Sequence, residues 1–396
     1  MPKTAVALKK FPSNPHRGRG RFAAFLLVLT SSLLPDVSFC AESLSASKTE
    51  WEKTLEAAKK EGQVSVYGSD TFENFLRGEF QKRFPWIKST FVGARGPIIG
   101  PKILTERRAE KYLVDIVLTG PGTPYRILYK AKVLDPIGPA LILPEVLDRS
   151  KWFQGMHHYV DSEEKYILIY EATVQSGDIA YNTKLVNPGE LQSYWDLLDP
   201  KWKGKIVSMD PKVSGAVSRG VRFFYFHLRL GPDFLKRLFG EMDITLSRDF
   251  TQMVDWLASG KNSLAIFAGS SETAKAAEQG LAVREFPPGH FREGDAVSPF
   301  NGTICLMNRA PHPNAAKVLI NWLLSKEGQS AAQKHLAAEG NVRESLREDI
   351  PKEVIPLAHR RVSGIGYTMI SRAADIDGEK AALQLVNDAL AGAKKK

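Results

Sequence analysis

Short apolar runs alternate with segments of helical periodicity in the first part of the chain. Three such runs, at Val64–Tyr67, Ile87–Val92 and Val114–Leu118, are rich in apolar residues, which is typical of buried parallel strands. Between the first two, phenylalanines recur at helical spacing from Phe72 to Phe84, and Pro85 stops the pattern. Alternating strands and helices predict a parallel sheet covered by helices.

The same alternation returns in the middle of the chain. Strands are predicted at Ile206–Met209 and Ser263–Phe267, with helices at Ala216–Leu230 and Phe250–Ser259. After one more strand, Phe300–Met307, the pattern is helical to the end. The fold class is therefore predicted as α/β, with two doubly wound units.

The first forty residues have the composition of a targeting segment. Basic residues precede the apolar run Phe22–Leu34, and small residues follow near Ser38–Ala41. The run is shorter than the ~20 residues that span a bilayer, so residues 1–40 are predicted to be a cleaved secretory signal peptide, with an uncleaved anchor as the alternative. Bulky Phe39 before Cys40 argues against lipidation. A periplasmic protein is expected, with the small polar residues 41–48 as a tether.

Charge and cysteine content narrow the function further. The formal charge is +10, but residues 1–40 hold six Lys/Arg and one Asp, so removing them leaves about +5. No basic stripe interleaved with aromatic residues is present, so nucleic-acid binding is not expected. With Cys305 as the one cysteine beyond Cys40, there is no disulfide framework.

Motifs for catalysis, cofactors and metals are weak. Gly120-x-Gly122 lacks the third glycine of a dinucleotide fingerprint, since Tyr125 stands there, and it follows the third strand rather than the first. His157 and His158 are adjacent, so on a strand they would point to opposite faces and rarely bind one ion. No nucleophile, base and orienting group can be assembled by spacing. We expect no enzyme, no cofactor and no metal.

Small polar residues recur where predicted strands turn into helices. Backbone N–H groups and hydroxyls at helix starts bind anions, although each residue could equally serve as a helix cap. In a doubly wound sheet such turns converge on one crevice, and Arg95 and Arg248 could pair there with a ligand carboxylate or phosphonate. The candidate ligand-binding residues are Ser69, Asp70, Thr71, Arg95, Gly96, Gly120, Gly122, Thr123, Ser214, Gly215, Arg248, Ser270 and Ser271.

Four segments resemble the periplasmic solute-binding proteins of ABC transporters. They are WEKTLEAAKKEGQVSVYGS, DIAYNTKLV, WDLLDPKWKGKIVSMDP and APHPNAAKVLINWLLSKEGQSAAQ. The resemblance covers about residues 50–350 and is closest to the group that includes ferric-iron, thiamine, aminoethylphosphonate and sugar-phosphate receptors.

The resemblance implies a type II binding-protein fold, in which two crossing hinge strands join two α/β lobes and the ligand lies between them. The crossings would fall near Thr173–Tyr181 and Ser298–Ile304, which adds Tyr181 and Asn301 to the candidates. The implied lobes are residues 49–175 with 300–396, and residues 176–299. Closure about the hinge around a ligand follows from this architecture.

One departure bears on the ligand. Ferric-binding members carry a tyrosine pair where this chain has Ser270 and Ser271, and a histidine near the position of Asp70 or Thr71. Two serines cannot supply the phenolate charge that Fe(III) requires. We therefore expect an anionic or polar organic solute, with a ferric complex of an organic acid as an alternative.

The expected function is that of a monomeric receptor that delivers a small-molecule solute to an ABC permease and its ATPase. Binding would stabilise the closed form, which the permease recognises. Two alternatives stay open. One is a receptor whose closed form signals to a membrane sensor; the other is a secreted enzyme on the same fold, marked by ionisable groups with perturbed pKa values in the cleft.

Overall fold

The computed structural model describes residues 36–175, 178–212 and 216–393. By internal contacts the chain divides into residues 1–43 and 44–396. Helix α1 (Asp36–Glu61) covers residues 41–48, so the segment that is predicted to be a tether is helical. No proline or glycine interrupts it before Gly62, which ends the helix at φ +67°. The apolar run at 22–34 lies outside the described residues, and among those described no helix is long and apolar enough to cross a membrane.

The first lobe is built on a mixed sheet with the strand order β2-β1-β3-β14-β6-β5 and β4 paired to β14. The first three strands are parallel, as predicted, and β14 lies antiparallel between β3 and β6. The strands are β1 (Gln63–Gly68), β2 (Lys88–Gly93), β3 (Ile116–Thr119), β4 (Leu134–Asp135), β5 (His158–Tyr159), β6 (Leu168–Ile169) and β14 (Thr303–Met307). The helices are α2 (Glu73–Phe75), α3 (Gln81–Arg83), α4 (Gly96–Arg108), α5 (Pro144–Leu147), α10 (Pro313–Leu324) and α11 (Lys326–Ala338).

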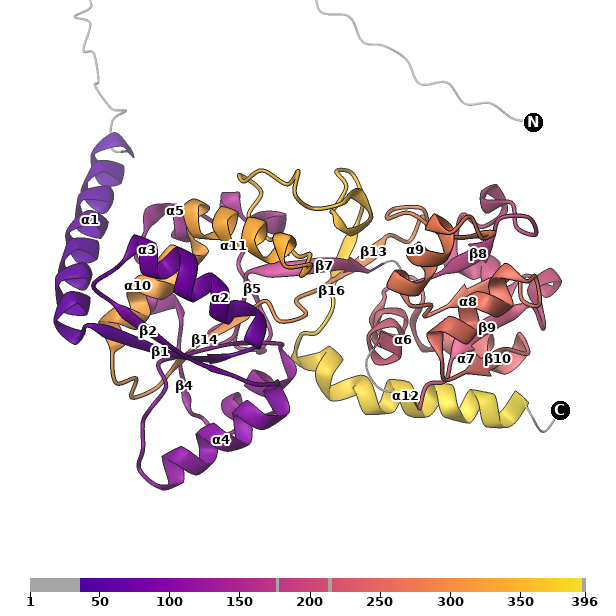
Figure 1. Cartoon of the computed structure of the whole chain (residues 1–396), viewed down its shortest axis with the longest axis horizontal. Coiled ribbons are helices and arrows are strands. Elements are labelled where there is room, and N and C mark those ends of the chain that lie inside the picture. Colours follow the sequence, from indigo (N-terminus) through magenta and orange to yellow (C-terminus); the bar gives the residue numbers. More distant parts are fainter. Residues whose placement is uncertain (1–35, 176–177, 213–215, 394–396) are drawn as a thin grey trace, which may run out of the picture. The chain divides into compact units, whose positions relative to one another are not determined.

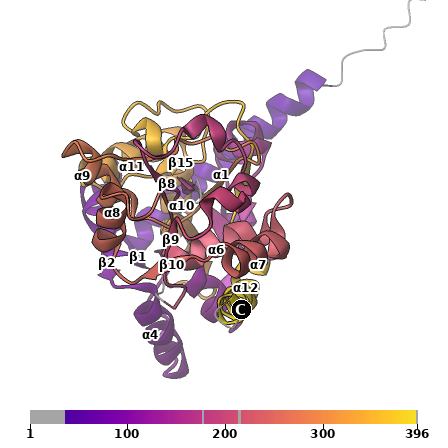
Figure 2. The same cartoon turned by 90° about the vertical axis from the view of Figure 1, so that its right-hand side faces the viewer.

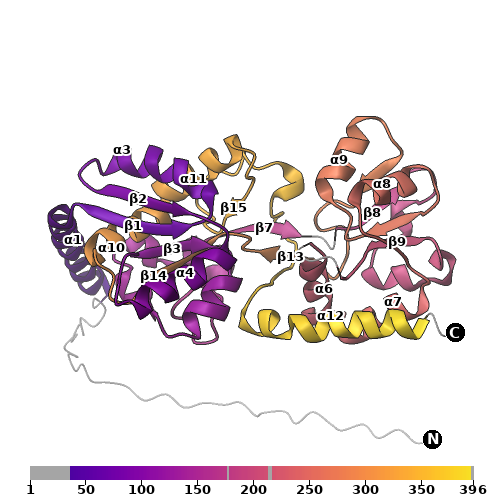
Figure 3. The same ribbon diagram turned by 60° about the horizontal axis from the view of Figure 1, so that its bottom comes forward.

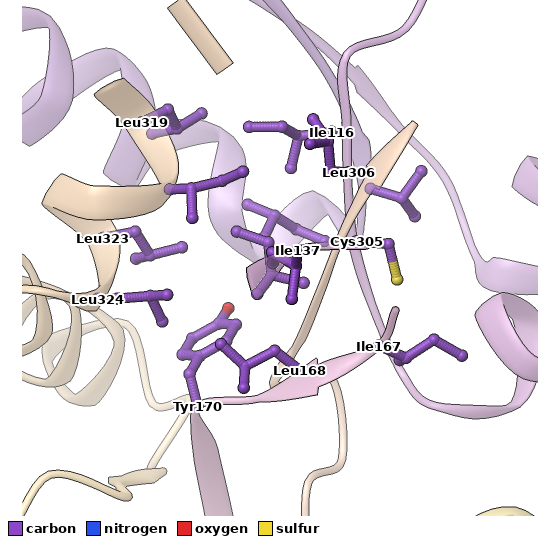
Figure 4. Packing of buried hydrophobic residues seen from close by; sticks show 14 of the residues in the cluster. Ile116, Ile137, Ile167, Leu168, Tyr170, Cys305, Leu306, Leu319, Leu323 and Leu324 are labelled. Carbon is purple, nitrogen blue, oxygen red and sulfur yellow. The ribbon is translucent and has the colours of Figure 1, made fainter. Parts of the chain in front are cut away.

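Apolar side chains from distant parts of the sequence form the core of this lobe (Figure 4). Ile116 of β3 and Cys305 of β14 are fully buried, as are Leu319 and Leu323 of α10. Burial of these side chains on both faces of the central strands explains why the strands are nearly continuous apolar runs in the sequence. The core therefore joins the N-terminal strands to a strand and a helix that follow the second lobe.

The second lobe repeats this arrangement with the order β10-β9-β11-β8-β12. Again the first three strands are parallel, and the strand that enters from the connection, β8, is antiparallel to its neighbours. The elements are β8 (Ala180–Asn182), β9 (Ile206–Met209), β10 (Thr245–Ser247), β11 (Leu264–Ile266), β12 (Val283–Glu285), α6 (Ala216–Phe226), α7 (Gly231–Glu241), α8 (Phe250–Ala258) and α9 (Ser270–Glu278).

A separate sheet, β15-β7-β13-β16, forms the connection between the lobes (Figure 1). Its central strands, β7 (Glu171–Gln175) and β13 (Asp295–Ser298), run antiparallel. They are flanked by β15 (Glu344–Ser345) and β16 (Tyr367–Met369), which come from the C-terminal part of the chain. The two crossing strands expected from the family resemblance are thus present, within a wider sheet.

The C-terminal helix α12 (Ala373–Ala393) differs from the predicted lobe division, which assigns residues 300–396 to the first lobe. It packs along α7 and α6 of the second lobe (Figures 1, 2 and 3). Ala382 and Val386 are fully buried in the second core, whereas Ala373 and Ile376 at the start of the helix belong to the first. The helix therefore contacts both lobes.

Candidate functional site

Three turns at the carboxyl ends of β1, β2 and β3 lie together, as the sequence predicts for a parallel sheet. Asn301 of the hinge donates a hydrogen bond from Nδ2 to Ser69 Oγ, 3.1 Å away. A Cβ at Gly96 would overlap the Thr123 hydroxyl, and one at Gly120 would lie 2.5 Å from the Phe300 carbonyl oxygen. Glycine is needed at both positions because neighbouring loops approach the backbone this closely.

The turns after β2 and β3 form one wall of a cavity of about 580 Å³. We call it the arginine cavity. The first lobe contributes Gly96, Thr119, Gly120, Gly122, Thr123 and Arg126. The second lobe contributes Ser218, Arg219 and Arg222 of α6; Ser298 ends the hinge strand β13, and Phe300 and Asn301 follow it; Ser371 and Glu379 come from the C-terminal part. Both lobes and the hinge therefore share one cavity.

Three arginines give this cavity its positive charge. Arg219 and Arg222 are three residues apart on α6 and so share one face of the helix, while Arg126 comes from the helical turn Pro124–Tyr129 of the first lobe. The Arg222 side chain is 11% exposed, and burial lowers its pKa. Within the described chain, the buried Nε atoms of Arg219 and Arg222 have no hydrogen-bond partner. Partly buried guanidinium groups whose Nε donors are buried and unused favour an anionic ligand.

Among the described residues that line the cavity, one carboxylate, that of Glu379, lies beside these arginines. Glu379 Oε2 lies 2.5 Å from Arg126 Nη2 and 3.4 Å from Arg222 Nη1. The neighbouring Asp375 is buried, and this burial raises the pKa of its carboxyl. The three guanidinium groups and the Glu379 carboxylate together give the cavity lining a net positive charge.

A second cavity of about 460 Å³ shares Arg219 and Phe300 with the first. It is bordered by Asp178, at the second-lobe end of the hinge, and by Arg343. Burial raises the pKa of Asp178 to about 6, and the nearby positive charge of Arg219 opposes that rise. Arg219 is held between the two cavities, with its guanidinium carbon 5.8 Å from the Phe300 ring centre.

The structure places the predicted site residues unevenly. Five line the arginine cavity, namely Gly96, Gly120, Gly122, Thr123 and Asn301. Ser69 adjoins it through Asn301, and Thr71 donates to Ser69 Oγ at 3.3 Å. Asp70 and Arg95 are exposed and lie outside the cavity lining.

Two further predicted residues, Arg248 and Tyr181, lie outside the cavity lining. Arg248 Nε binds Asp210 Oδ2 at 2.9 Å, and the Arg248 side chain is 71% exposed. Tyr181 packs on Phe286 within the second lobe, with ring centres 4.6 Å apart. Ser270 and Ser271 begin α9, of which only the backbone is described there. Ser214 and Gly215 lie outside the described residues.

The charged residues of the cavity are those that sequence reasoning missed. Arg219 and Arg222 follow the predicted Ser214–Gly215 turn within two helical turns. Ligands of open α/β sheets bind at the carboxyl ends of the strands. Including the first turns of the following helix in the candidate site would have identified both arginines. Glu379 carried no such signal, because its helix was assigned to the other lobe.

The adjacent histidines are packed inside the first lobe. His157 Nε2 lies 2.9 Å from the Val146 carbonyl oxygen, and His158 Nε2 lies 3.0 Å from that of Phe153. Burial lowers the pKa of His158 to about 4. Among the described residues, no three His, Cys, Asp or Glu side chains are grouped to hold a metal ion.

Residues 163–335 match the family described as bacterial extracellular solute-binding protein. Solved structures of other proteins are similar to most of the chain, and three examples each cover 83% of it. They are the Trichodesmium FutA protein in complex with iron and citrate (21% identity, 99% of that chain, TM-score 0.59), iron-bound HitA from Pseudomonas aeruginosa (19%, 99%, 0.53) and the Bordetella ferric binding protein (18%, 98%, 0.59).

At these identities the likeness shows the fold, and the fold is the predicted type II periplasmic binding-protein fold. No curated protein sequence matches the chain. The predicted resemblance to solute-binding proteins is confirmed by the family match and by the shared fold.

Proposed function

We propose that this chain, similar to extracellular solute-binding proteins, captures a small anionic solute in the arginine cavity and delivers it to an ABC-type importer. The observation that carries the proposal is the meeting of Arg219 and Arg222 from the second lobe with the Thr119–Thr123 turn of the first. A solute held by both sides would stabilise the closed arrangement, which is the form that a permease recognises.

The chemistry of the cavity supports an anion. The guanidinium groups provide directed donors for carboxylate, phosphate or phosphonate oxygens, and hydroxyls of Thr119, Thr123 and Ser218 line the same space. Binding of a solute between the lobes explains why these residues line the cavity. It involves no chemical step and needs no nucleophile. We further propose that the protein acts in the periplasm as a monomer.

A ferric complex of an organic acid is the second candidate. The Trichodesmium protein, which shares the fold, is described in complex with iron and citrate. The three arginines could bind the carboxylates of such a complex, so the protein would need few ligands of its own on the metal. Citrate with and without ferric iron therefore belongs in any ligand screen.

The experiment is a thermal-shift and calorimetric screen of the purified protein. The panel is sulfate, phosphate, phosphonates, sugar phosphates, di- and tricarboxylates, and citrate with and without ferric iron. A ligand at 100 times its Kd should stabilise the protein by about 2.7 kcal/mol. The Arg222→Gln and Arg219→Gln variants should lose this stabilisation, whereas Arg248→Gln, which removes the same charge outside the cavity, should keep it.

Two results would contradict the proposal. If no anion binds, or if Arg248→Gln abolishes binding while Arg222→Gln does not, the arginine cavity is not the solute site. If a bound compound is converted into a product, the secreted-enzyme alternative holds instead. A shift with citrate only when ferric iron is present would select the second candidate.

A further inference from the structure

Glu379 occupies a position between arginines that belong to different lobes. The same oxygen, Oε2, lies 2.5 Å from Arg126 and 3.4 Å from Arg222. Both arginines line the arginine cavity, and so does Glu379 itself, whose side chain is 20% exposed. A carboxylate of the protein therefore already interacts with two of the three guanidinium groups that a solute anion would contact.

The start of α12 holds this carboxylate in place. Tyr125 Oη donates to Asp377 Oδ2 at 2.5 Å, and Lys130 Nζ lies 3.2 Å from Asp377 Oδ1. Arg126 Nη2 also donates to the Ile376 carbonyl oxygen at 3.1 Å. These bonds join the first turns of α12 to the first lobe, while the rest of the helix packs on α6 and α7. Glu379 is thus anchored on both sides.

We propose that Glu379 is an internal counter-anion that competes with the solute for Arg126 and Arg222, and so determines how solutes of different charge are bound. This inference rests on the proposed function, because it assumes that the arginine cavity holds the solute. Glu379 would limit the affinity of the cavity for the solute. Multiply charged anions would then be bound tightly enough to be captured and weakly enough to be released.

The charge dependence follows from Coulomb's law. Repulsion between Glu379 and a bound anion is proportional to the charge of that anion, so a dianion is disfavoured by twice the free energy of a monoanion in the same position. The largely buried carboxylate is screened less than a surface group. Removing the Glu379 charge should therefore raise the affinity for monoanions and for dianions. The factor by which the affinity for a dianion rises should be the square of the factor for a monoanion.

The test compares sulfate, a dianion, with methanesulfonate, a monoanion of similar shape, by calorimetry at fixed ionic strength. In Glu379→Gln, methanesulfonate should bind about tenfold and sulfate about a hundredfold more tightly than in the wild type. Glu379→Asp keeps the charge and should stay within about threefold of wild type. Asp388→Asn removes an equal charge from the exposed side of the same helix, outside the cavity lining, and should change either affinity by less than about threefold.

Equal gains for both ions in Glu379→Gln would overturn the inference, because they would indicate a release of α12 and not a charge effect. Weaker binding would also overturn it, since Glu379 would then position the arginines. Circular dichroism and melting curves verify that each variant is folded. A different result would contradict the proposed function itself: neither the wild type nor Glu379→Gln would bind any anion of the screen. Binding that is lost in Arg222→Gln but unchanged in Glu379→Gln would overturn the inference alone.

Discussion

Arg343 and Glu171 form a buried ion pair at the hinge, with 2.9 Å between Nη1 and Oε1 and side chains that are 3% and 5% exposed. Glu171 begins the hinge strand β7, and Arg343 precedes β15, which pairs with that strand. Burial raises the pKa of the Glu171 carboxyl, and the positive charge of Arg343 opposes this rise. Two opposite charges are therefore buried together in the connection between the lobes, and each compensates the other.

Replacing one partner should leave the other charge buried and unpaired. We expect Arg343→Met to lower the free energy of unfolding by about 3–5 kcal/mol, as for other broken buried pairs. The double variant Glu171→Met/Arg343→Met should recover part of that loss, since no isolated charge is left. Urea denaturation of the single and double variants measures both values. A single variant as stable as the wild type would show that the pair is solvated.

Asp295, the first residue of the hinge strand β13, should make stability depend on pH. It is 1% exposed, and burial raises the pKa of its carboxyl to about 6, although the Gly289 amide donates to Oδ2 at 2.6 Å. Because the folded-state pKa is above the unfolded value, the stabilisation is complete below the unfolded pKa and is lost as pH rises through about 6.

Asp295→Asn should remove this dependence while keeping an oxygen that accepts from Gly289. The stability of the variant relative to wild type should therefore increase by about 1 kcal/mol between pH 5 and pH 8. Denaturation curves at several pH values measure the difference. Asp388→Asn, on the exposed side of α12, serves as the control and should show no such trend. A difference that is constant with pH would contradict the prediction.

Gly96 and Gly122 both line the arginine cavity but differ in the space around them. A Cβ at Gly96 would overlap the Thr123 hydroxyl, whereas a Cβ at Gly122 would meet nothing within 4 Å. Gly96→Ala should therefore displace the Thr123 turn, lower the stability by about 1–3 kcal/mol and weaken anion binding by about tenfold. Gly122→Ala is the matched control for stability and should keep it. Gly138→Ala, whose Cβ also meets nothing within 4 Å and which lies outside the cavity lining, is the control for binding and should keep the anion affinity. Melting temperatures and calorimetric titration with the screened anion report the two effects.

Cys305 should be protected from modification in the folded protein. It is fully buried on β14, and burial raises the pKa of its thiol well above the ordinary value. Since the thiolate is the reactive form, iodoacetamide should label the Cys305 peptide in urea and not under native conditions. Mass spectrometry of the digested protein distinguishes the two. Rapid native labelling would show that the first core opens readily.

The parts of the site that the sequence predicts are those set by local structure. Gly96, Gly120 and Thr123 were predicted because turns after parallel strands meet at one edge of the sheet, and the strand pattern was visible in the apolar runs. Arg248 was expected at the cleft for the same reason, but it pairs with Asp210 at the surface. An arginine at a turn has several carboxylates within reach, and the pattern does not show which one it meets.

By itself, the sequence determined the α/β class, the parallel strands of each lobe and the turns that line the cavity, because apolar periodicity is dictated by neighbours close in the chain. Only the tertiary structure decided that α12 lies on the second lobe, and that Arg126, Arg222 and Glu379 meet. These residues come from segments about a hundred or more positions apart. Their contact depends on how whole helices pack, which requires matching of distant apolar surfaces and is not encoded in any local pattern.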